Sequence, residues 1–286
     1  MSTRQNPYNR YSIFDNTRHI TPRDQHLLDL LAEHHVLSTR QIAALFYPSL
    51  RRAQDRLVVL HRAEVLSRHT WGTATGGATD YLYSLGPLGA RLRPNASYDL
   101  DRPRRVSPRN HMERMSRLVS SPSLNHTVGV NQFFVDLSAR ARTDARCALV
   151  RWWSERRATA VYDRSGIHPD GHGIWRCGEK TVGFFLEHDN GTENHARVVS
   201  KFAAYRELAA HGPTYPVLLW VPSRGRRDNL LASLTGVGVP AAVAIQGADP
   251  AARVWYLAGF GGPYHLHDLP SDHGPDSAIN PGRFHP

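Results

Sequence analysis

The chain has 286 residues, enough for two ordinary domains, and 41% of them are hydrophobic, which excludes a wholly disordered protein. No apolar run approaches the roughly 18 residues of a membrane span, and the polar stretch from Met1 to Tyr11 lacks the apolar core of a signal peptide, so we expect a cytoplasmic protein without a membrane partner. The formal net charge is +10, of which residues 1–117 carry +8, so the first part of the chain is the expected contact with a polyanion.

Three helices are expected in the first third of the chain. Thr21 can cap the first helix, Pro22 suits its first position, and a stripe of leucines follows. After a short break, Ser38 can cap a second helix over 39–46. A Pro-Ser pair then begins a third helix over about 50–63, which has an apolar side and a basic side.

Two β-like segments follow at 65–70 and 80–85, joined by a glycine-rich loop over 72–78. Three helices before such a hairpin are the order of a winged helix-turn-helix, an α+β fold whose third helix enters the major groove of double-stranded DNA. We place this N-terminal domain at 20–93, after a disordered N-terminus over 1–19. Its expected DNA-binding residues are Arg51, Arg52, Gln54 and Arg56.

Two other interpretations of this basic helix stay open. A helix with several arginines can simply be a solvated face, and winged helices also serve as protein–protein interaction modules. The order of the elements, the arginines and the local charge of +8 together favour DNA binding.

A second domain of the α/β class, with a mixed central sheet, is expected over 123–260. A linker rich in Pro, Arg and Asp precedes it over 94–122, and a flexible tail rich in Pro, Gly and His follows it over 261–286. Its expected helices cover 125–142, 193–211 and 228–234. Its expected strands cover 148–153, 158–162, 181–188, 215–221 and 252–257, with a Pro-Asp-Gly turn inside 167–175.

The two cysteines indicate little chemistry of their own. Cys147 and Cys177 lack the spacing of metal ligands and are too few for a disulfide framework. We expect both to be reduced thiols.

Acidic residues in the second domain indicate its chemistry. Asp170 follows Pro169 in a turn, and Glu187 and Asp189 follow the apolar run 182–186. Acidic side chains at the end of a buried strand are costly unless they are paired or hold a metal ion. The candidate metal ligands are therefore Asp170, Glu187 and Asp189, and their hard carboxylate oxygens suit Mg²⁺.

The order of the elements, together with Pro169-Asp170 and the acids that follow Phe185-Leu186, resembles the PD-(D/E)XK nuclease-like superfamily. The resemblance implies a Mg²⁺-dependent endodeoxyribonuclease in which Asp170 and Glu187 hold the metal ion and Lys201 orients water or stabilises the developing charge. Asp170, Glu187 and Lys201 are thus the expected catalytic residues.

One departure from the superfamily's pattern weakens this resemblance. The usual lysine position is occupied here by Asp189, so Lys201 would have to reach the site from the following helix. Glu155 and Glu193 are possible accessory acids. An inactive relative would show the same pattern if it used these acids for salt bridges and helix capping.

A narrower resemblance covers about residues 20–235, where several motifs recur in the order of the replication-relaxation family, a group of actinobacterial proteins of plasmids and integrative elements. The motifs are Thr21-Pro22-Arg23-Asp24, Arg151-Trp152-Trp153-Ser154-Glu155-Arg156, His168-Pro169-Asp170-Gly171, Phe184-Phe185-Leu186-Glu187-His188-Asp189, and Gly191-Thr192-Glu193 with Lys201 and Tyr205. The resemblance implies a role in plasmid replication or mobilisation. Double-stranded DNA and plasmid replication or transfer proteins are then the expected partners. A non-catalytic regulator or accessory factor, whose second domain is a protein-interaction module, is the alternative.

Overall fold

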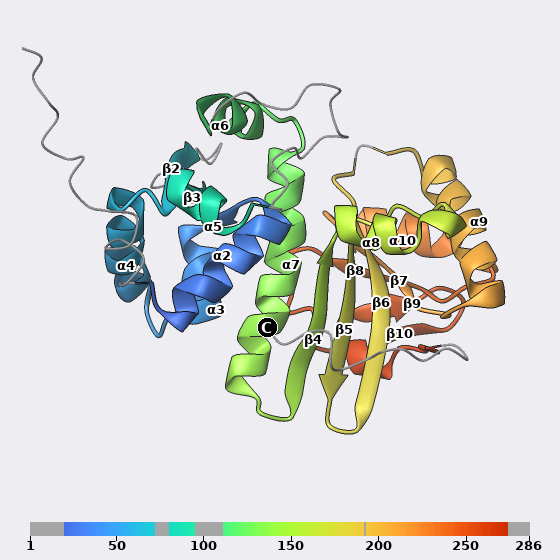
Figure 1. Ribbon diagram of the computed structural model, residues 1–286. Coiled ribbons are helices and arrows are strands. Elements are labelled where there is room, and N and C mark those ends of the chain that lie inside the picture. Colours follow the sequence, from blue (N-terminus) through green and yellow to red (C-terminus); the bar gives the residue numbers. More distant parts are fainter. Residues whose placement is uncertain (1–19, 72–79, 95–110, 192, 274–286) are drawn as a thin grey trace, which may run out of the picture. The chain divides into compact units, whose positions relative to one another are not determined.

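The computed structural model describes residues 20–71, 80–94, 111–191 and 193–273, and the chain divides into two compact units, Met1–Leu124 and Asn125–Pro286 (Figure 1). The expected disordered N-terminus, the loop over 72–78, most of the expected linker and the last part of the expected tail lie outside the described residues. No helix within the described ranges has the length and apolar character needed to cross a membrane.

The first unit begins with the three expected helices, α2 (Pro22–His34), α3 (Thr39–Phe46) and α4 (Leu50–Arg62). Each starts at a side-chain cap. The hydroxyl of Thr21 accepts a hydrogen bond from the N–H of Asp24, and the carboxylate of Asp24 accepts one from the N–H of Thr21. Ser38 and Gln41 form the same reciprocal pair at α3, and Ser49 caps α4.

The expected hairpin is β2 (Leu66–Trp71) and β3 (Asp80–Leu85). A short strand, β1 (Leu37–Ser38), lies where only a break was expected, because residues 37 and 38 pair with Tyr83 and Leu82 of β3. The sheet is antiparallel with the order β1-β3-β2. Two further helices complete this unit, α5 (Pro87–Leu92) and α6 (His111–Val119).

Helix α6 lies inside the segment expected to be an exposed linker. Its Met115 and Leu118 side chains are buried, and the Met115 sulfur accepts a hydrogen bond from Ser84 of β3. The hydroxyl of Ser67 in β2 also lies 2.9 Å from Nε2 of His111. These apolar and polar contacts add α6 to the first unit.

The second unit is an α/β structure with a mixed sheet, as expected, and the sheet has seven strands. Its helices are α7 (Leu124–Thr143), α8 (Glu155–Val161), α9 (His195–His211) and α10 (Arg224–Ser233). Its strands are β4 (Cys147–Ser154), β5 (Gly171–Cys177), β6 (Lys180–His188), β7 (Val217–Val221), β8 (Ala241–Ile245), β9 (Trp255–Leu257) and β10 (Gly261–Tyr264). Short 3-10 turns lie at Asp163–Ser165 and Leu266–Asp268.

The sheet order is β10-β9-β8-β7-β6-β5-β4, so β4 is one of its edges. Strands β6, β7 and β8 are parallel to one another, and the other neighbouring pairs are antiparallel. In chain order, a helix, three antiparallel strands, a helix and a parallel strand form the centre of the unit, with α8 inserted between β4 and β5.

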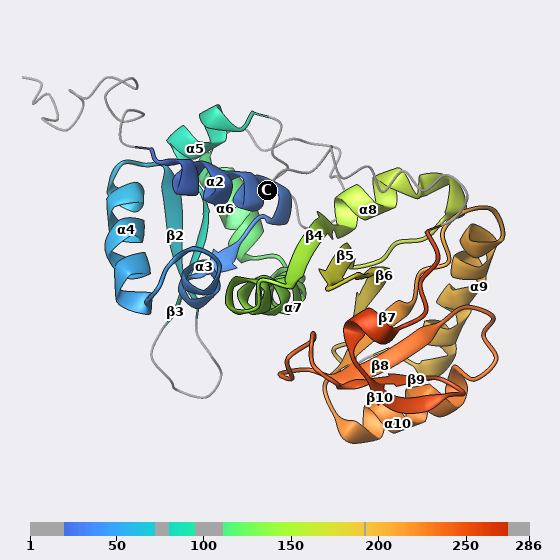
Figure 2. The ribbon, with the colours of Figure 1, turned by 90° about the horizontal axis from the view of Figure 1, so that it is seen from below.

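Helices cover both faces of this sheet (Figure 2). Because side chains alternate along a strand, neighbouring residues of β6 belong to different faces. Phe184 contacts Phe133 of α7 on one face, whereas Phe185 contacts Tyr205 of α9 on the other. The buried core beneath α9 and α10 includes Phe202 of α9 and apolar residues of β6, β7 and β8.

Four expectations for the second unit were wrong. The segment 158–162 does not continue the sheet, because Ser154 caps helix α8 there by accepting a hydrogen bond from the N–H of Arg157. Strand β8 had no counterpart among the expected elements. Strand β10 lies within the expected tail, which continues in a pairing of Thr214 with Asp272. Cys147 and Cys177 stand opposite each other in the β4–β5 register and form a disulfide instead of reduced thiols.

Candidate functional site

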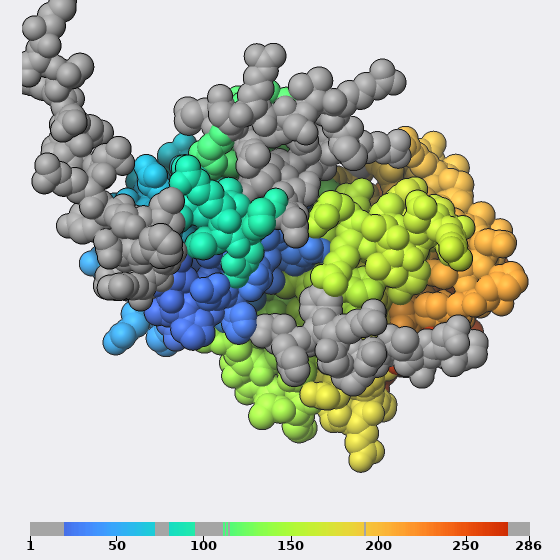
Figure 3. Space-filling model, viewed as in Figure 1, coloured from blue at the N-terminus to red at the C-terminus, as the bar shows by residue number. Residues whose placement is uncertain are grey.

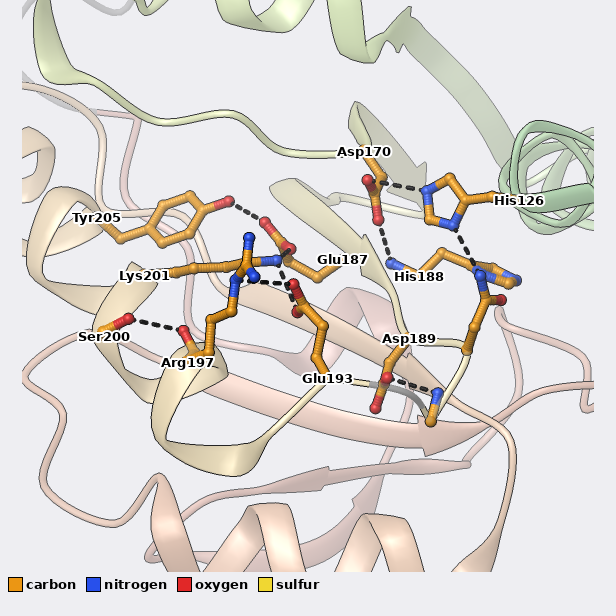
Figure 4. A network of polar contacts seen from close by, with 12 residues as sticks. His126, Asp170, Glu187, His188, Asp189, Glu193, Arg197, Ser200, Lys201 and Tyr205 are labelled. Atoms are coloured by element: carbon orange, nitrogen blue, oxygen red, sulfur yellow. Dashed lines mark hydrogen bonds and ion pairs between the residues drawn. The ribbon is translucent and has the colours of Figure 1, made fainter. Parts of the chain in front are cut away.

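A polar cavity of about 210 Å³ lies in the second unit where the acids were expected. Its lining includes Asp170, Glu187, Asp189, Glu193 and Lys201, so the structure brings five of the residues singled out in the sequence around one space (Figure 4). They come from the turn before β5, the end of β6, the following loop and α9.

Asp170 joins the start of β5 to the end of β6 and to α7. Its Oδ2 accepts a hydrogen bond of 2.6 Å from the backbone N–H of His188, and its Oδ1 lies 3.0 Å from Nε2 of His126. Burial alone would lower the pKa of His126, but the hydrogen bond and charge of Asp170 outweigh it and raise that pKa. His126 therefore favours its charged form beside Asp170.

Glu187 is almost completely buried and is held from α9. Its Oε1 accepts a hydrogen bond of 2.7 Å from the hydroxyl of Tyr205, and its Oε2 accepts one of 2.8 Å from the ammonium of Lys201. Burial, followed by the negative charge of Asp170, raises the pKa of Glu187 to about 7 in spite of these donors. Burial and the charge of Glu187 raise the pKa of Tyr205, which keeps its hydroxyl a donor.

Lys201 reaches the site from the helix that follows the strand, as the resemblance required. Its ammonium lies 2.8 Å from Glu187 and 3.1 Å from Glu193. Burial favours the neutral amine, but Glu187 and Glu193 outweigh it and raise the pKa of Lys201. Lys201 is therefore a fixed positive charge rather than a base.

Asp189 lines the cavity, but its carboxylate is engaged elsewhere. Oδ2 accepts a hydrogen bond of 2.6 Å from Nε of Arg226, and Oδ1 accepts one of 2.7 Å from the N–H of Gly191. The side chain of Gln246 donates to the carbonyl oxygen of Asp189 at 2.8 Å, and Arg226 also donates to the carbonyl oxygen of Glu193. Asp189 thus holds the β6–α9 connection in place.

The three expected metal ligands are not gathered as a set. Over the described ranges, a group of three His, Cys, Asp or Glu ligand atoms within 4.8 Å of one another occurs only at Asp144, Cys147 and Cys177, where both cysteines are in the disulfide. Asp170 and Glu187 share the cavity, and the charge of Asp170 acts on Glu187.

The two accessory acids differ in position. Glu193 lines the cavity and pairs with Lys201 and, at 3.5 Å, with Arg197. Glu155 begins α8 rather than ending a strand, and it is exposed. Its charge contributes to the raised pKa of His126, so it acts on the site through the electrostatic field.

His188 points to the opposite face from Glu187, as strand alternation predicts. Its ring lies 5.3 Å from that of His126, edge to face, and burial lowers its pKa. A β-carbon on Gly129 of α7 would stand 2.5 Å from the His188 ring, so only glycine allows the helix this close. His188 supports the site from the side of α7.

Arg226 and Gln246 were not anticipated, because neither lies in a motif and both come from elements after β7. His126 lies in none of the motifs, and Tyr205 lies in one without an assigned role. A helix-face argument could have found Tyr205, since Lys201 and Tyr205 are four residues apart on α9. Nothing in the sequence distinguishes Arg226 from its arginine neighbours.

The expected DNA-binding helix is α4 of the first unit. Arg51, Arg52 and Gln54 are exposed on it, and Arg51 forms an ion pair of 3.2 Å with Asp55. Arg56 differs from the expectation.

Arg56 turns toward its own unit, where its guanidinium lies 2.5 Å from the carboxylate of Asp24, a side chain that is 1% exposed. Arg56 therefore compensates a buried charge and ties α4 to α2, and only three of the four expected residues face outward.

Comparison with known proteins gives one assignment. The family model described as Replication-relaxation matches residues 28–218, more than half of the chain, including Asp170, Glu187 and Lys201. No curated protein and no solved structure shows a significant match. The chain belongs to the replication-relaxation family.

Proposed function

We propose that this chain is a DNA-binding protein of plasmid or mobile-element replication or mobilisation. Membership of the replication-relaxation family suggests a role associated with plasmid replication. Three helices followed by a hairpin, in a three-stranded antiparallel sheet, support a winged helix-turn-helix as the DNA-binding module.

The exposed side of α4 carries this proposal. Arg51, Arg52 and Gln54 project from the third helix of the unit, where recognition helices of this class contact base edges and phosphates. The apolar side of the same helix is used for folding, since Ala53 and Leu57 are 0% exposed. The outward side thus remains for a ligand, and its guanidinium groups suit phosphate oxygens and guanine edges.

Salt-dependent binding of duplex DNA tests the proposal. The full chain would be titrated with a 30-base-pair duplex by fluorescence anisotropy at several KCl concentrations, beside an Arg51→Ala/Arg52→Ala variant. Loss of two phosphate contacts should weaken binding and reduce the slope of log K against log salt by about 2. Arg91→Ala, which removes an exposed arginine of α5, is the matched control and should bind like the parent. Unchanged binding by the double variant would reject α4 as the DNA-contacting helix.

A second candidate function, Mg²⁺-dependent phosphodiester cleavage, is supported by the charge of the cavity. Asp170 and Glu187 face one space, and the charge of Asp170 helps to raise the pKa of Glu187 to about 7. Two carboxylates that repel each other in a buried site are a suitable pair for a divalent cation, which would relieve the repulsion. The order helix, three strands, helix, strand supports the nuclease-like resemblance.

The chain's own residues would contribute position and charge. Asp170 and Glu187 would hold the ion, and a bound Mg²⁺ supplies an activated water and neutralises charge on the phosphate. In hydrolysis the oxygen of one water would bond to phosphorus as the P–O ester bond breaks, and a proton of that water would end on the leaving oxygen. Lys201 stays an ammonium and so can stabilise the negative charge that develops. His126 keeps Asp170 oriented.

Incubation of supercoiled DNA with the chain, with Mg²⁺ or with EDTA, tests this second function. Nicking that needs the metal and disappears in Asp170→Asn and Glu187→Gln would support it. Glu179→Gln, which changes an exposed acid in the turn between β5 and β6, is the control outside the cavity. Binding of DNA without metal-dependent nicking would instead favour a non-catalytic accessory factor whose acids are structural.

A further inference from the structure

Arg151, on the edge strand β4, is a half-buried cation with no acid beside it. Its Nη1 lies 3.3 Å from Nε2 of His172, and its guanidinium carbon lies 4.1 Å from the centre of the Trp153 ring. No carboxylate within the described part of the chain forms an ion pair with it. A partly desolvated charge without a counter-ion is costly, so the site is incomplete in electrostatic terms.

The groups around Arg151 do not supply the missing negative charge. The His172 ring is fully buried, and its Nε2 faces a guanidinium that can only donate, so the ring is neutral. Its Nδ1 lies 2.8 Å from the carbonyl oxygen of Phe184, which leaves Nε2 to accept from Arg151. Tyr162 lies against the His172 ring, and burial raises the pKa of its hydroxyl, so it too is neutral.

A second guanidinium adds positive charge at the same ring. Arg157 of α8 stands over Trp153, with 5.2 Å from its guanidinium carbon to the ring centre. Helix α8, yellow-green in Figure 3, lies at the visible surface of its unit. The Arg151 cluster, which we define as Arg151, Trp153, Arg157, Tyr162 and His172, is therefore cationic and aromatic.

The Arg151 cluster lies on the same face of the sheet as Glu187. His172 stands opposite Phe185 in the β5–β6 register and contacts its ring, and Phe185 shares a face with Glu187. Arg151 stands opposite Ile174, four residues along β5 from Asp170, which is roughly 13 Å at the rise of a strand. That separation corresponds to roughly four base steps of duplex DNA.

We infer that the Arg151 cluster binds a backbone phosphate of DNA, with the guanidinium of Arg151 as the main contact. A phosphate would neutralise the uncompensated charge, and its oxygens match the planar fork of an arginine. The inference rests on the proposed DNA-binding function and extends it, because it gives the second unit a phosphate contact of its own.

Binding of the 30-base-pair duplex by the full chain, measured by anisotropy over a range of KCl concentrations, tests this inference. Arg151→Gln should weaken binding several-fold at low salt and reduce the salt slope by about 1. Arg151→Lys keeps the charge and a donor toward His172, so it should preserve the slope while losing part of the affinity. Arg176→Gln, which removes an exposed arginine of β5, is the matched control.

The outcomes separate this inference from the proposed function. If the wild type binds DNA and Arg151→Gln binds it with the same affinity and salt slope, the phosphate site is overturned. The proposed DNA-binding function then still stands. Absence of wild-type binding at low salt would overturn both. Melting curves establish whether each variant folds. If Arg151→Gln does not fold, Arg151→Lys decides the question. Unchanged affinity in Arg151→Lys would also overturn the inference.

Discussion

In the wild type, the free energy of unfolding of the second unit should fall as pH rises toward neutral, because Glu187 is buried. Replacing Glu187 by Gln should remove this fall. The ordinary pKa of this carboxyl is 4.5, and in the fold it is about 7. Below pH 4.5 both the folded and the unfolded chain hold the proton, and the full stability is present. Between pH 4.5 and 7 the unfolded chain loses the proton while the folded chain keeps it, so the free energy of unfolding falls as pH rises.

The size of the effect follows from the shift. Each pKa unit corresponds to about 1.4 kcal/mol, so the wild type should lose about 3 kcal/mol between pH 4.5 and 8 that Glu187→Gln does not lose. Glutamine is nearly isosteric with glutamate and can still accept the hydrogen bond from Tyr205.

Urea unfolding at several pH values, with EDTA present, measures this difference. Five of the six tryptophans lie in the second unit, with Trp71 as the exception, so tryptophan fluorescence reports mainly on that unit. The unfolding free energy of Glu187→Gln minus that of the wild type should rise by about 3 kcal/mol from pH 4.5 to pH 8. Parallel curves for the two proteins would refute the idea that Glu187 is protonated in the fold near neutral pH.

Three further substitutions test the packing. Arg56→Ala should cost the first unit about 3 kcal/mol in calorimetry, because it leaves the carboxylate of Asp24 buried without its cation; a loss below about 0.5 kcal/mol would contradict a compensating role. Gly129→Ala should destabilise the second unit by about 1–3 kcal/mol in urea unfolding, since the new methyl group would meet the His188 ring, and wild-type stability would show that the helix moves away freely. Phe133→Ala should cost about 3–5 kcal/mol of unfolding free energy in the same assay, because this ring is 0% exposed. It contacts the rings of Phe134 in its own helix and of Phe184, Trp220 and Trp255 in three strands.

Local signals in the sequence predicted most of the helices correctly. Thr21, Ser38 and Ser49 each cap the helix expected to follow them, because capping depends on residues three positions apart in the chain. The same local reasoning missed Ser154, whose cap begins α8 directly after a strand. There the apolar residues of 158–162 were compatible with either a strand or a helix.

Contacts between distant residues were harder to predict. The acids of the cavity could be found because each follows a recognisable turn or strand. The partners that decide their roles could not be found in the same way, since Arg226 meets Asp189 across 37 residues. In the first unit, Arg56 likewise meets Asp24 across 32 residues. Strand β1 and the Cys147–Cys177 disulfide likewise depend on sheet register, which alternation alone does not determine.

The family match ends at residue 218, but the folded unit does not end there. Asp189 is anchored by Arg226 of α10 and, through its carbonyl oxygen, by Gln246 after β8. A chain shortened to the matched region would lose both partners and leave a carboxylate that is 7% exposed without its cation. It would also cut β7 after its second residue and remove β8, which would leave β6 as a new sheet edge. The matched segment is therefore part of a larger folding unit, and experiments on the cavity need the residues that follow it.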